Sequence, residues 1–97
     1  MTMNIESTAS ALAALGHPAR LSVFRLLVRA GHDGMLVGEI AEHLDMPLST
    51  LAYHLRSLKQ AGLILQHRQG REIQTVADYS AMEAAIEYLM QECCRGI

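Results

Sequence analysis

Two adjacent cysteines near the C-terminus have the most distinctive chemistry in this sequence. Cys93 and Cys94 are the only thiols in a chain of 97 residues. Two neighbouring thiolates are ligands that soft ions such as trivalent arsenic prefer. They can also form a disulfide between adjacent residues, which is strained because neighbouring Cα atoms lie about 3.8 Å apart and ordinary disulfides need about 4.4–6.8 Å. Strain makes such a bond easily reduced, which suits a redox sensor.

Three interpretations of Cys93 and Cys94 are open at this stage. The pair could bind a trivalent arsenical, and an organoarsenical fits better than arsenite because arsenite usually takes three thiolates. It could be a redox switch, although the C-terminal end of a helix raises a thiol pKa instead of lowering it. In the plainest interpretation Cys93 is a small buried hydrophobe that completes an apolar stripe. The five histidines offer no ligand pair at metal-binding spacing on one helix face.

The second informative feature is the distribution of charge. The net charge is −2, yet residues 46–71 carry no acid and four bases, which are Arg56, Lys59, Arg68 and Arg71. An acid-free stretch of this length in a net acidic chain predicts local contact with a polyanion. The plainer interpretation is chance segregation of solvated charges.

Periodicity and helix-capping residues predict the elements that position these side chains. Apolar residues at helical spacing and terminal Ser, Asp, Pro and Gly residues predict helices over 7–15 (capped by Ser7), 18–30, 37–44, 48–61 and from 78 or 80 to 95. Alternation over 63–77, with a turn at Gln69-Gly70, predicts a β-hairpin, and Met35-Leu36 a short strand. Helix, turn, helix and hairpin in this order make a winged helix-turn-helix, mainly α with a β-hairpin wing.

The second helix of this motif leaves a polar face exposed. Leu51, Leu55 and Leu58 define its buried side, so Ser49, Tyr53, Arg56 and Gln60 point away from the core and Thr50 and His54 lie on the flanks. Arg can pair with guanine, Gln with adenine, and hydroxyls with phosphates. The few aromatic residues provide no stacking platform, which disfavours RNA as the partner. The sequence thus predicts double-stranded DNA contacts from Ser49, Thr50, Tyr53, His54, Arg56 and Gln60, and from Arg68 and Arg71 beside the wing tip. Of these, His54 is better suited to support the helix from its flank than to read a base.

Four segments resemble the ArsR/SmtB family of winged helix-turn-helix repressors. They are Leu15-Gly-His-Pro-Ala-Arg-Leu21, Val37-Gly-Glu-Ile-Ala-Glu-His-Leu44, Ser49 to Ile64 with its His-Leu-Arg-Ser-Leu-Lys-Gln-Ala-Gly-Leu core, and Arg68-Gln-Gly-Arg71. The resemblance implies a homodimer joined through the first and last helices, a near-palindromic operator, and release of DNA when a metal, metalloid or oxidant reaches the protein.

The sequence departs from the family in its sensing sites. The segment that carries a cysteine pair in the founding arsenic sensors is Val37-Gly-Glu-Ile-Ala-Glu, which has no cysteine, and the last helix has no histidine. Some relatives carry an adjacent arsenic-binding pair on the last helix, as Cys93 and Cys94 would be. We therefore expect a repressor with no obligatory cofactor and with trivalent arsenic as a candidate inducer. A redox-sensing repressor and a regulator without an inducer are the alternatives.

Other classes of protein fit less well. A thiol enzyme needs a cysteine activated by a base or a helix N-terminus, and neither cysteine has one. A winged helix that binds only protein would carry apolar or acidic residues on its wing, where this chain has Arg68 and Arg71. One domain spans residues 1–97, with the helix-turn-helix at about 37–61 and the wing at about 63–77. No apolar run of 18 residues and no secretory leader are present, so we expect a soluble, cytoplasmic protein.

Overall fold

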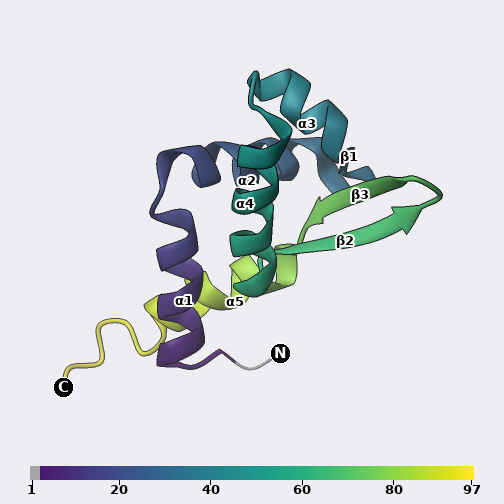
Figure 1. Ribbon diagram of the computed structural model, residues 1–97. Coiled ribbons are helices and arrows are strands. Elements are labelled where there is room, and N and C mark those ends of the chain that lie inside the picture. Colours follow the sequence, from purple (N-terminus) through teal and green to yellow (C-terminus); the bar gives the residue numbers. More distant parts are fainter. Residues whose placement is uncertain (1–2) are drawn as a thin grey trace.

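The computed structural model describes residues 3–97 and has the element order of a winged helix-turn-helix (Figure 1). The helices are α1 (Ile5–Leu15), α2 (Pro18–Ala30), α3 (Val37–Leu44), α4 (Leu48–Gln60) and α5 (Tyr79–Met90). The strands are β1 (Met35–Leu36), β2 (Ile64–Gln69) and β3 (Glu72–Ala77), and they form one antiparallel sheet in the order β1-β3-β2. The predicted fold class and the short strand at Met35-Leu36 are confirmed.

Helix α1 begins earlier than the sequence predicted. Asn4 is the N-cap, and its side chain accepts a hydrogen bond from the Ser7 amide at 2.8 Å. The Ser7 hydroxyl accepts in turn from the Asn4 amide at 3.0 Å. The prediction that Ser7 caps the helix is therefore wrong. Asn4 and Ser7 together satisfy two free amides, which a cap at Ser7 alone would not do.

Helix α2 is central to the core. Its N-cap is His17, whose Nδ1 accepts from the Ala19 amide at 3.2 Å, and the loop after it is a single 3₁₀ turn, η1 (Gly31–Asp33). Its apolar residues Leu21, Phe24, Leu27 and Val28 repeat with helical spacing and so predict one buried stripe, but this is only partly right, because Leu21 and Val28 are 43% and 42% exposed. The helix packs against α1, α4 and β3 on different sides, so its buried arc is wider. That arc comprises Val23, Phe24, Leu26 and Leu27.

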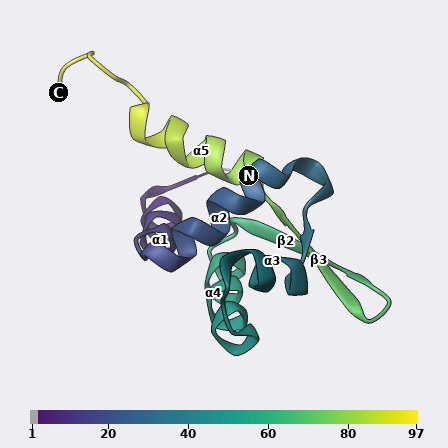
Figure 2. The same cartoon turned by 90° about the horizontal axis from the view of Figure 1, so that it is seen from above.

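The predicted buried side of α4 is confirmed, since Leu51, Leu55 and Leu58 all lie in the core. They pack there with Leu27 of α2 and Ile40 of α3. In the view of Figure 2, α4 lies on one side of α2 and α5 on the other. The core therefore fixes α4 from behind and leaves its opposite face uncovered.

The wing turn is shifted by one residue from its predicted place. Gln69 pairs with Glu72, so the two-residue turn is Gly70-Arg71 and not Gln69-Gly70. Gly70 has φ +64°, which suits the first central position of a tight hairpin turn. Arg71 therefore lies in the turn itself.

Helix α5 is shorter than predicted. Asp78 is its N-cap, and the Asp78 carboxylate accepts a hydrogen bond from the Ala81 amide at 3.1 Å. The Tyr79 hydroxyl donates a hydrogen bond to the Val28 carbonyl at 3.1 Å and so joins α5 to α2. The helix ends at Met90 and not at Arg95, because Gln91 leaves the helical conformation and Glu92 and Cys94 have positive φ. Cys93 and Cys94 thus follow the helix instead of lying on it.

No single helix within residues 3–97 is long and apolar enough to cross a membrane. The bent pair formed by α1 and residues 18–33, with an angle of 98°, is the one combination that matches a span by length and composition alone.

Candidate nucleic-acid interface

The turn between α3 and α4 has the predicted length and positions α4. Asp45 adopts a left-handed conformation with φ 50°, and the Met46 amide donates to the Ala41 carbonyl at 2.9 Å. Pro47 then precedes the first turn of α4. At the other end of α3, the Glu39 carboxylate accepts from the Leu36 amide at 2.9 Å and holds its start against β1.

The uncovered face of α4 carries most of the residues predicted to contact DNA. Ser49, Thr50, Tyr53, Arg56 and Gln60 are all exposed. No acid occurs on this helix, so nothing on it would repel a phosphate backbone. The arrangement brings hydroxyls, a phenol, a guanidinium and an amide together on one side of a helix, which are the groups that pair with base edges and phosphates.

His54 does not share this face. Its side chain is only 6% exposed, and its ring lies 4.9 Å from the ring of His17 and 5.4 Å from that of Tyr53. Burial, followed by the nearby His17 and Arg20, lowers the pKa of His54. The structure therefore removes His54 from the predicted DNA contacts, and it agrees with the expectation that this residue supports the helix from its flank. His54 packs the middle of α4 against the start of α2.

The wing presents its two arginines to solvent. Arg68 on β2 and Arg71 in the turn are both exposed. Two side-chain hydrogen bonds cross the strands below them. The side-chain amide of Gln69 donates to the side-chain oxygen of Gln74 at 2.9 Å, and the side-chain amide of Gln66 donates to the Thr75 hydroxyl at 3.1 Å. These cross-strand bonds stiffen the hairpin between its tip and its base.

A hollow of about 280 Å³ lies between α4 and the wing. Arg56, Lys59 and Gln66 supply its polar lining, and Val37, Leu55 and Ile73 are among its apolar residues. Lys59 was not among the predicted contact residues. The sequence could have indicated Lys59 as a contact residue, because it follows Arg56 by three residues on the same acid-free helix. Arg56 and Lys59 beside this hollow, and Arg68 and Arg71 farther out at the wing tip, make up a basic surface.

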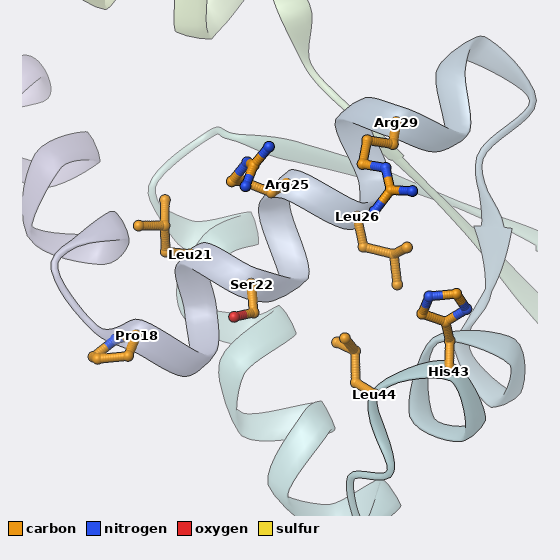
Figure 3. A pocket seen from close by; sticks show the side chains of 8 residues that line it. All are labelled: Pro18, Leu21, Ser22, Arg25, Leu26, Arg29, His43 and Leu44. Carbon is orange, nitrogen blue, oxygen red and sulfur yellow. The ribbon is translucent and has the colours of Figure 1, made fainter.

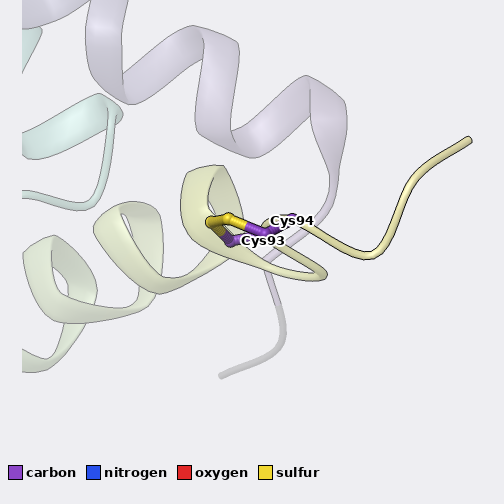
Figure 4. The surroundings of a disulfide bond; sticks show 2 residues. All are labelled: Cys93 and Cys94. Carbon is purple, nitrogen blue, oxygen red and sulfur yellow. A yellow bond between two sulfur atoms is a disulfide. The ribbon is translucent and has the colours of Figure 1, made fainter.

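The two cysteines lie far from this surface. The wing tip and the C-terminal segment are at opposite ends of the molecule in both views (Figures 1 and 2). Cys93 and Cys94 are exposed, and their sulfur atoms are bonded to each other (Figure 4). The interpretation that Cys93 completes a buried stripe is therefore wrong. Within residues 3–97 no group of three or more His, Cys, Asp or Glu is placed to hold a metal ion.

Comparisons with known proteins agree with this geometry. A family model described as a helix-turn-helix domain matches residues 15–67. The transcriptional repressor SdpR of Bacillus subtilis (strain 168) is 31% identical over 83 residues, which cover 86% of this chain and 89% of that protein. The transcriptional repressor PagR of Bacillus anthracis is 33% identical over 88 residues, which cover 90% of this chain and 85% of that protein.

A solved structure of similar fold names the family. The crystal structure of an ArsR family transcriptional regulator superposes with a TM-score of 0.78 at 28% identity, over 95% of this chain and 92% of the other. The transcriptional regulators of this family bind DNA. The chain belongs to the ArsR/SmtB family of winged helix-turn-helix transcriptional repressors.

Proposed function

We propose that this repressor acts in the cytoplasm as a homodimer on a near-palindromic operator, with one α4 in the major groove of each half-site. The observation that carries the proposal is the exposed, acid-free face of α4, together with the exposed bases Lys59, Arg68 and Arg71. In this arrangement the recognition helix in the major groove reads the bases, and the basic wing contacts the phosphates of the adjacent backbone.

The dimer is supported by uncovered apolar side chains on the first and last helices. Ile86 and Leu89 of α5 are 54% and 57% exposed, and Ile5 and Leu12 of α1 are also exposed. Helices α1 and α5 contact each other, so these side chains belong to neighbouring elements. A chain this small buries a smaller fraction of its surface on folding than a larger domain does, and a second copy would cover the apolar residues.

We further propose that Cys93 and Cys94 receive the inducer, and that the inducer is a trivalent arsenical. Once the pair is reduced to two thiols, an organoarsenical with two hydroxyl groups on arsenic would release both as water, while each thiol gives up its proton and forms one As–S bond. Because the pair follows α5, binding there would alter the proposed dimer contact and so the spacing of the two α4 helices. The alternative is an oxidant that converts the same two thiols to a disulfide.

The test is fluorescence anisotropy of the reduced protein on DNA from upstream of its own gene. We expect phenylarsine oxide to release the DNA, and the Cys93→Ser/Cys94→Ser double variant to bind DNA normally and to ignore the arsenical. Release by hydrogen peroxide alone would favour the redox alternative. DNA binding that neither reagent changes would overturn the role of the cysteines and leave the repressor intact.

The DNA-binding surface is tested independently by charge reversal. Arg56→Glu and Arg71→Glu should each weaken operator binding and lower its salt dependence, whereas Arg95→Glu, at the exposed C-terminal segment, should not. Unchanged affinity and unchanged salt dependence in both reversals would overturn the assignment of this face.

A further inference from the structure

A second hollow lies between α2 and the C-terminal end of α3, and the proposed function does not use it (Figure 3). Its volume is about 420 Å³, which is within the range of small-molecule sites. It shares no lining residue with the hollow between α4 and the wing. The residues that line it are Pro18, Leu21, Ser22, Arg25, Leu26, Arg29, His43 and Leu44.

The lining combines an apolar surface with unpaired cations. Figure 3 shows Leu26 and Arg29 of α2 pointing toward His43 and Leu44 of α3. Arg25 lines the same hollow, and no carboxylate does. Across residues 3–97 the one ion pair found joins Arg95 to Glu92, so both arginines here are without an acidic partner. Leu21 adds an apolar side chain that is nearly half exposed.

This lining defines the chemistry of an occupant. Guanidinium groups bind carboxylates through paired, charge-assisted hydrogen bonds. Leucine and proline side chains lose water favourably when an apolar body covers them. A simple inorganic anion would satisfy the arginines and leave the leucines uncovered, whereas a neutral apolar molecule would do the reverse.

We propose that the cleft between α2 and α3 binds a small organic anion, in which a carboxylate is attached to an aromatic or aliphatic body. Arg25 and Arg29 hold the carboxylate, and Leu21, Leu26 and Leu44 cover the body. The site is separate from Cys93 and Cys94, so it stands whether or not those residues sense an inducer. Because α3 is the first helix of the helix-turn-helix, an occupant lies against the motif that positions α4.

The experiment is a titration of the full-length protein with 2-naphthoate, followed by two-dimensional amide NMR. We expect shift changes concentrated at Leu21, Ser22, Arg25, Leu26, Arg29, His43 and Leu44. The neutral analogue 2-naphthamide should bind at least about tenfold more weakly, since it lacks the charge-assisted bonds. Arg25→Gln/Arg29→Gln should lose the same factor, whereas the matched control Arg68→Gln should bind 2-naphthoate like the parent. Both variants must retain the parent spectrum outside the substituted residues.

Three results would overturn the proposal. The first is the absence of shifts at this cleft up to about 5 mM 2-naphthoate, where a Kd near 1 mM would be detected. The second is shifts confined to the exposed apolar residues of α1 and α5, which would indicate adsorption there. The third is an effect of Arg25→Gln/Arg29→Gln in the absence of ligand. A changed dimer dissociation constant would assign the arginines to contact with a second copy, and a changed operator affinity would assign them to contact with DNA.

Discussion

The rings of His17 and His54 lie 4.9 Å apart and connect the start of α2 to the middle of α4. His17 caps α2 through its Nδ1, while the Nδ1 of His54 is buried without a hydrogen-bond partner. The Nε of Arg20 is also buried without a partner, and Tyr53 flanks the other side of His54. The ionisable groups that act on His54 are a second imidazole, His17, and a guanidinium, Arg20. The protonated, positively charged form of His54 is therefore unfavourable in the folded protein.

Acidification should destabilise the protein through this contact. Burial, His17 and Arg20 lower the pKa of folded His54, whereas in the unfolded chain it returns to about 6.5. The unfolded state therefore binds this proton first as the pH falls, so the stabilising contribution is present above about pH 6.5 and is lost below it. The slope for one proton is at most about 1.4 kcal/mol per pH unit.

Urea unfolding at fixed protein concentration, between about pH 7.5 and about pH 5.5, measures this slope. His54→Gln should flatten it, and the exposed residue His67 provides the control His67→Gln, which should keep the parent slope. Equal slopes in the parent and His54→Gln would remove His54 as the cause.

Two glycines with the same backbone conformation should tolerate alanine very differently. Gly31 has φ 79° and ψ −162°, and Gly34 has φ 69° and ψ −161°. This conformation costs an L residue about 1–3 kcal/mol at either position. A Cβ at Gly31 would meet nothing within 4 Å, whereas at Gly34 it would collide with the Thr75 carbonyl oxygen and a methyl group of Val76.

We expect Gly31→Ala to lower the free energy of unfolding by about 1–3 kcal/mol. Gly34→Ala should lower it further, because β1 must move away from β3 to relieve the collision. Chemical denaturation gives both values, and amide NMR of Met35 and Thr75 reports the pairing of the strands. Equal losses in the two variants would mean that β1 does not approach β3 as closely as described.

The sequence predicted α4 and its exposed face well because the information is local. Leucines at 51, 55 and 58 repeat with helical spacing and are followed by the punctuating Gly62. The wing was predicted for the same reason, since alternation and a turn signal occur within one short segment. Its turn was displaced by one residue because register depends on pairing across the strands, which fixes Gln69 opposite Glu72.

What the sequence did not predict depends on residues that folding brings together. The partner of His54 was not predicted, because its ring contact with His17 joins residues that are distant in the sequence. The cleft between α2 and α3 requires the packing of two helices, so no spacing could indicate it. Helix α5 ends at Met90 without a glycine or proline at the boundary to mark it, and the apolar pattern up to Cys93 predicted a longer helix.

Removing a buried hydroxyl from α1 should stabilise the protein. The Thr8 side chain is 2% exposed, and its Oγ1 has no hydrogen-bond partner. Valine has nearly the same shape without the polar atom, so Thr8→Val should raise the free energy of unfolding by about 1 kcal/mol. Thr50→Val, on the exposed face of α4, should change it by no more than about 0.5 kcal/mol. Thermal and urea unfolding measure both changes, and a loss of stability in Thr8→Val would indicate that Oγ1 is bonded in solution.

The proposed dimer can be disrupted on α5 without disturbing the core. Ile86 and Leu89 are more than half exposed, so a charge there is harmless in a monomer and is unfavourable in an apolar interface. Ile86→Glu and Leu89→Glu should each shift the protein toward monomer in sedimentation velocity and weaken operator binding. Leu65→Glu provides the control, since Leu65 is an exposed apolar residue of the wing. A dimer that survives both α5 substitutions would place the interface on another surface.

The salt dependence of operator binding should separate phosphate contacts from base contacts on the basic surface. Each phosphate contact that is lost reduces the slope of log affinity against log salt by about 0.9. Lys59 lines the hollow between α4 and the wing, and Arg71 lies in the wing turn, so Lys59→Gln and Arg71→Gln should each lower the slope by about that amount on operator and on unrelated DNA. Ser49→Ala and Gln60→Ala, at exposed positions on α4, should leave the slope almost unchanged and reduce the preference for operator. Anisotropy titrations at several salt concentrations give both quantities. If Gln60→Ala lowered the slope and Arg71→Gln reduced only the preference, the roles assigned to α4 and the wing would have to be exchanged.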